Sequence, residues 1–341
     1  MLKILLRAFS VLAVIAVLAA AWLVIDYRQF LNTPLALGGQ ALHYDIAPGT
    51  GVKKIAQDLE RRGVVKHWFY LAALARLQGQ AHQIKAGEYE FIAGTTPTQL
   101  LDQLVAGRVL EYSFTLVEGW TFRQLLEALR QNTALQHTLT GLNDAQIMER
   151  LGWPGQHPEG RFLPDTYRFP KGTTDAAFLQ RAYRAMSERL ESEWRARSPE
   201  VALGDPYQAL ILASIVEKES ARPEERAVIA GVFLRRLERG MRLQTDPTVI
   251  YGMGAGFDGD IRRRDLRADT PYNTYVREGL PPTPIAMPGA DALHAALHPA
   301  PGASLYFVSR GDGSHEFSDT LEAHNKAVQK YQLSNTKKAE K

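Results

Sequence analysis

Glu219 is the residue whose surroundings in the sequence best suit acid–base chemistry. It lies within residues 210–240, where two stretches with helical apolar spacing are separated by Pro223. At the helical period, the residues within about 60° of Glu219 are apolar: Leu212, Ile215 and Val216. Glu217 points to the opposite side of the same helix. A carboxyl group on an apolar face loses hydration, which raises its pKa toward the range in which a general acid works near neutral pH.

The proline also sets the position of this carboxyl along the chain. Because proline cannot continue the helix, we expect Glu219 in its last turn, where the chain opens toward a surface or a cleft. A structural role is the alternative, since Arg222 or Arg226 could pair with Glu219 and keep it ionised. Serine chemistry is not predicted, because Ser214 lies on the other side of the helix and Ser220 lacks a Gly-x-Ser-x-Gly turn.

Cleavage of a glycan is the chemistry that best suits this set of residues. A protonated Glu219 could give its proton to a leaving oxygen, and aromatic side chains could lie against sugar rings. The candidate aromatic residues are Tyr251, Tyr272 and Tyr275. Ordinary glycosidases use two carboxylates, and Asp165 and Asp246 are available partners, although the sequence does not fix their distance from Glu219.

Metal, nucleotide and thiol chemistry have less support in the sequence. His294 and His298 are four residues apart on an expected helix, which would place both imidazoles on one face. No glutamate follows His294 in the metalloprotease pattern, and His298 precedes a proline at the helix end, where a histidine more often bonds carbonyls. Residues 252–256 are glycine-rich but have no strand-loop-helix frame. The chain has no cysteine, so disulfides, thiolate metal sites and thiol nucleophiles cannot contribute. We expect neither a metal nor a cofactor.

Residues 8–25 form an almost wholly apolar run, close to the ~20 residues that a membrane-spanning helix needs. A cleaved signal peptide is the alternative, with a small-residue site at 19–21, but the apolar run continues past these alanines. Lys3 and Arg7 precede the run, which favours a cytoplasmic N-terminus. We therefore expect a single-pass protein of a bacterial inner membrane, with the chain after residue 26 in the periplasm.

Length and composition predict an α+β protein with about two folded domains after this anchor. The expected division is a cytoplasmic stub and transmembrane anchor at 1–26, a linker at 27–40, a small module at 41–107, a catalytic domain at 108–334 and a disordered tail at 335–341. The formal net charge of +3 is spread along the 341 residues. It is compatible with an acidic polymer or a membrane surface, and it predicts no nucleic-acid partner.

The small module is expected to contain strands at 41–46 and 87–91, with helices at 52–62 and 68–77 between them and one more at 98–105. This strand-helix-helix-strand order resembles a LysM-like glycan-binding module, and a plain spacer domain is the alternative. In the larger domain, the expected elements include a strand at 111–117, helices at 121–130, 176–194 and 321–331, and a hairpin formed by 305–309 and 315–317.

Several blocks of residues, in order along the chain, carry a family resemblance. They are Glu118-Gly119, Pro164-Asp165-Thr166, Ala213-Ser-Ile-Val-Glu-Lys-Glu219, Arg242-Leu-Gln-Thr-Asp-Pro-Thr-Val-Ile-Tyr-Gly252, Tyr272-Asn-Thr-Tyr275, Gly279-Leu-Pro-Pro282, Pro288-Gly289, His298-Pro299 and His324-Asn325. The chain resembles the MltG (YceG-like) family of endolytic murein transglycosylases over almost its whole length. The sequence departs from the family pattern at two places: at Thr283, where we expect glycine in the family, and at residues 221–225.

The resemblance implies a reaction and a set of residues for it. The second glutamate of the Glu-Lys-Glu run, Glu219, would protonate the bridging oxygen between N-acetylmuramic acid and N-acetylglucosamine and then, as a base, help the muramic C6 hydroxyl close on C1. A single carboxyl group would thus serve without a nucleophilic partner. The candidate residues for holding the sugar and the developing positive charge are Gln244, Thr245, Asp246, Tyr272 and Asn273.

The sequence therefore predicts a membrane-anchored enzyme that cuts nascent peptidoglycan strands internally and leaves 1,6-anhydromuramic ends. The resemblance also implies peptidoglycan synthases as partners. A membrane-tethered glycan-binding scaffold without catalysis is the alternative.

Overall fold

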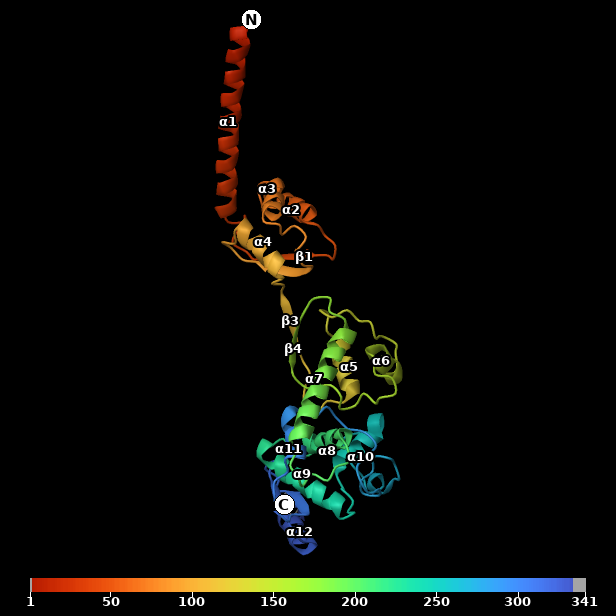
Figure 1. The fold of residues 1–341 in the computed structure, drawn as a ribbon. Coiled ribbons are helices and arrows are strands. Elements are labelled where there is room, and N and C mark those ends of the chain that lie inside the picture. Colours follow the sequence, from red (N-terminus) through yellow and green to blue (C-terminus); the bar gives the residue numbers. More distant parts are fainter. Residues whose placement is uncertain (1, 334–341) are drawn as a thin grey trace, which may run out of the picture. The chain divides into compact units, whose positions relative to one another are not determined.

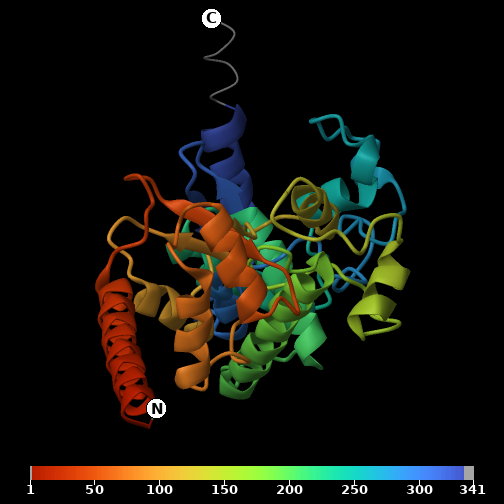
Figure 2. The same ribbon diagram turned by 90° about the horizontal axis from the view of Figure 1, so that it is seen from above.

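The computed structural model describes residues 2–333, so the tail expected at 335–341 lies outside it. Helices and helical turns make up about half of this part, and its strands form three two-stranded sheets (Figures 1 and 2). The α+β class predicted from the sequence is confirmed. The chain forms two compact units: a first one up to Tyr112 that also includes Arg168–Gly172, and a second one made of Ser113–Tyr167 and the chain from Thr173 onward.

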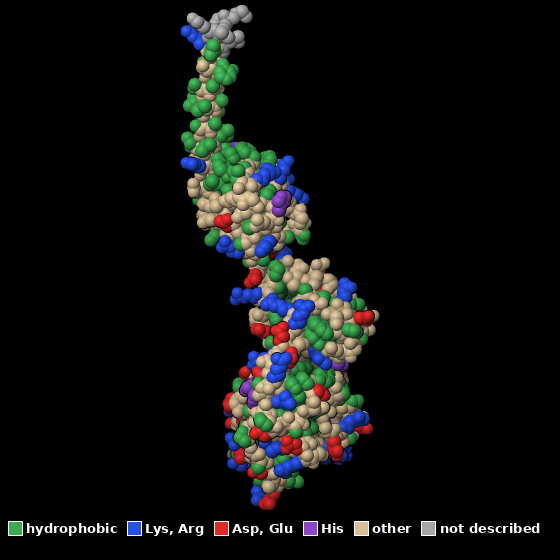
Figure 3. Space-filling model, viewed as in Figure 1, with side chains coloured by type: hydrophobic (Ala, Val, Ile, Leu, Met, Phe, Trp, Pro, Cys, Tyr) green, Lys and Arg blue, Asp and Glu red, His purple; other side chains and the backbone are tan. Residues whose placement is uncertain are grey.

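Helix α1, Leu2–Asn32, begins the first unit and contains the predicted membrane anchor. Over Phe9–Asn32 it is long and apolar enough to cross a membrane, and none of that stretch is buried within the protein. Figure 3 shows hydrophobic side chains spread along the described part of this helix. A helix that exposes apolar groups on every side is suited to lipid, because its backbone polar groups are bonded within the helix.

The segment that follows the anchor differs from the expected linker at 27–40. The helix continues to Asn32, and Leu35 is buried in the core of the small module. The amide of Leu35 donates to the carbonyl of Thr95 at 2.8 Å, and the amide of Ala36 donates to that of Val64 at 3.0 Å. These apolar and backbone contacts explain why residues 33–36 pack as part of the module.

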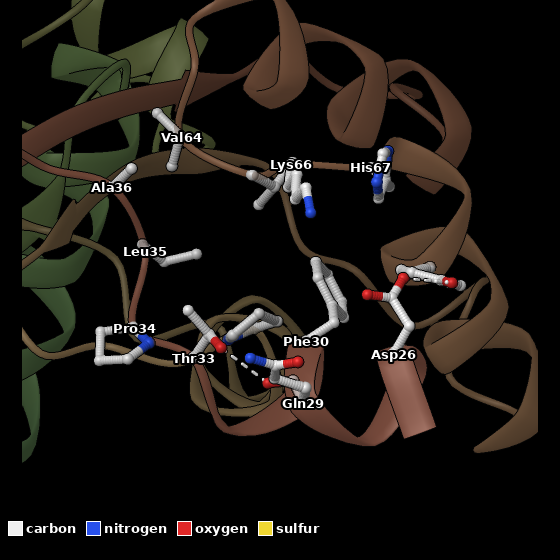
Figure 4. Close-up of a pocket in the computed structure, with 13 residues that line it drawn as sticks. Asp26, Gln29, Phe30, Thr33, Pro34, Leu35, Ala36, Val64, Lys66 and His67 are labelled. Carbon is white, nitrogen blue, oxygen red and sulfur yellow. Dashed lines mark hydrogen bonds between the residues drawn. The ribbon is translucent and has the colours of Figure 1, made fainter. Parts of the chain in front are cut away.

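The end of α1 is also held by side-chain contacts. The Tyr70 hydroxyl donates to Asp26 Oδ2 at 2.7 Å, and the Tyr70 ring packs against Tyr27 and Phe30. A pocket of about 290 Å³ lies between this end of the helix and residues 64–67 (Figure 4). The anchor and the module are therefore joined by packing as well as by the chain.

The module has the predicted order of strands and helices. Its elements are β1 Leu42–Ile46, α2 Val52–Arg61, α3 Trp68–Leu77, β2 Gly87–Phe91 and α4 Pro97–Ala106. Strands β1 and β2 pair antiparallel, with Tyr44 opposite Tyr89. Alternate residues of both strands are buried with one face of each helix, as the two-residue and 3.6-residue periods require. Thr96 begins α4 with a capping box to Gln99.

The chain passes between the units within β3, Glu111–Thr115, and β4, Thr166–Pro170, which pair with each other. The other elements of the second unit are α5 Phe122–Arg130, α6 Asp144–Leu151, α7 Asp175–Ala196, α8 Pro206–Glu219, α9 Pro223–Glu238, α10 Asp246–Met253, α11 Ala290–Leu297, β5 Tyr306–Ser309, β6 His315–Ser318 and α12 Leu321–Val328. Short turns occur at Gly254–Gly256 and Asp265–Arg267, and a π-helical turn at Gln329–Leu333 follows α12. The predicted hairpin, β5 with β6, is confirmed.

Helix α8 is the central element of the second unit. Its residues from Ala209 to Val216 are all buried, and it packs against α7, α9, α10 and α11. A helix this apolar on every side is stable only inside a core. Asp205 caps its first turn by accepting from the Gln208 amide, so the helix has a defined start as well as a defined end.

Glu159, in the loop before β4, has a carboxyl group that is buried in this unit. Its Oε1 accepts from the Phe122 amide at 2.9 Å, and its Oε2 accepts from the Tyr251 hydroxyl at 3.0 Å. Burial raises the pKa of Glu159 to about 7. This carboxyl group therefore links the start of α5 to α10, and its burial there is the reason for its raised pKa.

We predict that Glu159→Gln reduces the pH dependence of stability. The folded protein holds the Glu159 proton more tightly than the unfolded chain, so its contribution to stability is present below pH 4.5 and is lost as pH rises through about 7. Between pH 5 and pH 8 this loss amounts to about 2 kcal/mol in the wild type and is absent in the variant. Urea denaturation of the full chain in detergent measures it. Glu149→Gln, an exposed site, is the control; equal pH slopes in all three proteins would contradict the prediction.

Candidate active site

Glu219 is the last residue of α8, as Pro223 led us to expect. The next residue, Ser220, has an extended backbone with φ −136°, and Pro223 occupies the first turn of α9. The side chain of Glu219 leaves the apolar core at this break and lines a groove of about 470 Å³. The sequence therefore places a carboxyl group at the end of a buried helix and on a surface that solvent can reach.

The environment of the Glu219 carboxyl favours its protonated form. Burial raises its pKa to about 7, and the nearby negative charge of Asp246 acts in the same direction. The Thr245 hydroxyl donates to Oε1 and, with the charge of His315, partly opposes this rise. A carboxyl group with a pKa near neutrality can both give and accept a proton under physiological conditions.

Neither of the two arginines that might have neutralised Glu219 pairs with it. Arg226 pairs with Glu217 instead, with Nη2 3.1 Å from Oε1, and both side chains are more than nine-tenths buried. Arg222 donates to the carbonyl of Asp312. The second oxygen of Glu217 accepts from the Gly289 amide at 2.9 Å. The prediction that Glu217 and Glu219 face opposite sides of α8 is confirmed, and only Glu217 has the contacts of a structural ion pair.

Ser214 has a structural role, in agreement with the absence of a predicted serine nucleophile. Its hydroxyl donates to the Ile211 carbonyl and accepts from the Ile285 amide at 3.0 Å. It therefore fastens the chain near residue 285 to α8.

The groove brings together four of the predicted site residues: Glu219, Gln244, Asp246 and Tyr275. They come from the end of α8, from the segment leading into α10, and from the loop that follows α10. The Tyr275 hydroxyl donates to Asp246 Oδ1 at 2.6 Å, which fixes one carboxylate near the other. Thr245 is buried behind them and reaches Glu219 through its hydroxyl.

The backbone at Gln244 is strained in a way that suits this arrangement. Gln244 has φ 54°, and it is the only non-glycine residue with positive φ among residues 2–333. Such a conformation costs roughly 1–2 kcal/mol for a residue with a side chain. Arg236 supports it from α9, since Nη1 donates to the carbonyls of Arg242 and Leu243 at 3.1 and 2.8 Å. The turn that presents Thr245 to Glu219 is therefore fixed by a buried guanidinium.

Sequence reasoning did not identify the residues on the opposite wall of the groove. This wall is formed by β5, β6 and α12 and includes His315, His324 and Asn325. Glu225 orients His315, because its two oxygens contact the ring Nδ1 at 2.7 Å and the backbone amide at 3.0 Å. His324 and Asn325 form one of the sequence blocks that carry the family resemblance. That signal could have added them to the candidate site.

Three other candidates are not among the residues that line this groove. Tyr251, Tyr272 and Asn273 do not line this groove. Tyr251 donates to Glu159, and the Tyr272 hydroxyl is 2.9 Å from that of Thr283. Asn273 is almost fully buried and donates to carbonyls at residues 265 and 268. The polar atoms of Tyr272 and Asn273 hold the long loop after α10, and that of Tyr251 joins α10 to the loop before β4.

Asp165, considered as a second carboxylate, is also absent from the groove lining. Its Oδ1 accepts from the Thr166 amide at the start of β4. Thr283, which departs from the expected family pattern, has its hydroxyl bonded to Tyr272 and to the Pro284 carbonyl. Asp246 is therefore the carboxylate of the predicted set that accompanies Glu219.

Comparisons with known proteins agree on one family. The model of the YceG-like family matches residues 44–330. An endolytic murein transglycosylase of Bacillus subtilis is 31% identical over 316 residues, which cover 87% of this chain and 86% of that protein. One of Streptococcus pneumoniae is 26% identical over 341 residues, covering 89% of this chain and 61% of that protein.

A solved structure extends this agreement to the fold. The 2.6 Å crystal structure of a yceG-like protein of Listeria monocytogenes has a TM-score of 0.53 and 28% sequence identity. The match covers 85% of this chain and 99% of that one. On the extent of the family match and the similarity to the Bacillus protein, this chain belongs to the YceG-like family.

Proposed function

We propose that this protein is a lytic transglycosylase that cleaves peptidoglycan strands internally, with Glu219 as its acid and base. The observation that carries the proposal is the state of the Glu219 carboxyl. It is desolvated, has a pKa near 7, has no arginine partner and opens onto a groove. The names of the similar proteins from Bacillus and Streptococcus support murein as the substrate class.

In the first step, protonated Glu219 donates to the oxygen that joins N-acetylmuramic acid to N-acetylglucosamine, and the bond from muramic C1 to that oxygen breaks. In the second step, the carboxylate takes the proton of the muramic C6 hydroxyl as this oxygen bonds to C1. The products are a free hydroxyl on one strand and a 1,6-anhydro end on the other. No water is added, and Glu219 returns to its protonated form.

The bond from Thr245 makes the two oxygens of Glu219 unequal. Oε1 is held by the hydroxyl, which leaves Oε2 to exchange the proton with the substrate. The negative charge of Asp246 would stabilise the positive charge that develops on the sugar ring, and Tyr275 holds Asp246 in place. Gln244 offers an amide to the sugar hydroxyls. For Tyr251, Tyr272 and Asn273 we propose a supporting role, because their polar atoms are bonded to other parts of the protein.

The first unit would place this activity at a membrane. We propose that α1 spans the inner membrane once, with Lys3 and Arg7 on the cytoplasmic side and the rest of the chain in the periplasm. The strand-helix-helix-strand module would bind glycan in the manner of a LysM domain. Peptidoglycan synthases are the proposed partners, since they supply new strands at that surface. The alternative is a tethered glycan-binding scaffold without catalysis, and the next experiment distinguishes it from the enzyme.

We predict that Glu219→Gln abolishes cleavage and leaves the fold intact, whereas Glu217→Gln retains much of the activity. Loss of a general acid and base costs about 10²-fold to 10⁴-fold in rate. Glu217→Gln instead weakens the buried pair with Arg226, so it lowers the melting temperature. The full chain in detergent is incubated with purified murein, and the products are analysed by mass spectrometry.

Three outcomes of that experiment would count against the proposal. Equal loss of activity in both variants would refute the assignment of Glu219. Reducing muramic ends would indicate hydrolysis in place of ring closure. Binding of murein without new ends in the wild type would favour the scaffold.

We predict that kcat/KM falls as pH rises above about 7, because Glu219 must begin the reaction protonated. Thr245→Val removes the hydroxyl that stabilises the carboxylate, so it should shift this alkaline limb to higher pH. Thr248→Val is the matched control, because its hydroxyl bonds to Thr245 O and Thr274 and does not touch the carboxyl group. A limb that stays fixed in Thr245→Val, or moves equally in both variants, would show that another group controls it.

A further inference from the structure

Glu193, His294 and His298 form a cluster on the second unit, and none of them lines the groove that contains Glu219. Glu193 lies near the end of α7, and the two histidines lie on the last turn and C-cap of α11. Glu193 Oε2 is 2.9 Å from His294 Nδ1 and 3.5 Å from His298 Nε2. One oxygen of the carboxylate thus faces a nitrogen of each ring.

The donor types and their spacing suit a transition-metal ion. Two imidazole nitrogens and one carboxylate oxygen are a usual protein ligand set for zinc. With metal–ligand bonds of about 2.1 Å, neighbouring ligands of a tetrahedral ion are about 3.4 Å apart. The three ligand atoms of this cluster all lie within 4.8 Å of one another. Small side-chain movements are therefore enough to place all three around one ion.

The neighbouring groups hold the cluster in this orientation. The two imidazole rings stack with centroids 4.2 Å apart. Ser198 Oγ is 3.4 Å from His298 Nδ1, the ring nitrogen that does not face the carboxylate. Arg189 Nε is 3.1 Å from Glu193 Oε1, the oxygen that does not face the histidines. Partners of this kind on the non-ligating atoms are typical of protein metal sites, because they fix the direction of the ligands.

We propose that Glu193, His294 and His298 bind one zinc ion or a similar first-row dication. The side chain of His294 is 58% exposed, so solvent can reach the cluster and supply a fourth ligand. The ion would join the end of α7 to the end of α11, and both helices pack against α8, which carries Glu219. Its role is to stabilise that packing, and it takes no part in glycan cleavage.

Isothermal titration of zinc chloride into the untagged full chain in detergent, after treatment with a chelator, tests the proposal. The wild type should bind one zinc ion per chain, and zinc should raise its melting temperature. His294→Ala and Glu193→Gln should each weaken binding by about tenfold or more and remove the thermal effect. Cobalt in place of zinc should give the intense visible absorption of a tetrahedral site in the wild type but not in these two variants.

His43→Ala is the matched control. His43 Nε2 lies 3.6 Å from Glu90, so it forms a histidine–glutamate pair like that of the cluster but belongs to the first unit. This variant should bind zinc as the wild type does. Absence of stoichiometric binding by the wild type would overturn the proposal and leave the cluster as a set of ion pairs. Unchanged affinity in His294→Ala, or loss of binding in His43→Ala, would also overturn it.

Discussion

The candidate active site depends on one interaction. The desolvated carboxyl group of Glu219 accepts a hydrogen bond from a single neutral donor, the hydroxyl of Thr245. Glu219 ends a helix whose preceding residues lie in the core, so its carboxyl group loses most of its hydration. A hydroxyl from Thr245 compensates for part of that loss without supplying a positive charge. Arg236 bonds the strained turn at Gln244, and this turn holds the Thr245 hydroxyl in place. Glu219 is thus held at the end of a core helix in surroundings that favour its protonated form.

The contrast between Glu217 and Glu219 shows how environment assigns different roles to the same residue type. The two side chains are two positions apart on α8. Glu217 receives a guanidinium and a backbone amide, which are the contacts of a structural ion pair. Glu219 receives one hydroxyl and faces an open groove. Separation of carboxyl environments in this way is how proteins distinguish an acid from an ion pair.

Of the predicted residues that line the groove, only Glu219 was predicted from a local repeat, whereas Gln244 and Asp246 were candidates through the family resemblance. Helical period and proline placement were sufficient for Glu219 and for the opposite direction of Glu217, because both effects act over a few residues. Loop residues follow no period. For Tyr272 and Asn273, only the folded chain shows that their polar atoms are already bonded within it. The wall with His315 lies almost a hundred residues beyond Glu219, so no local pattern could place it there.

The length of α1 has a mechanical consequence for the first unit. The helix runs about seven residues beyond the apolar stretch predicted at 8–25, which is about 10 Å of additional rise. That distance is comparable to one layer of lipid headgroups. With the apolar stretch in a bilayer, the contacts of Tyr70 and Leu35 would then set the module directly on the lipid surface, with little freedom to tilt. The motion of the module would then be confined to rotation and lateral diffusion in two dimensions, at one fixed height above the bilayer.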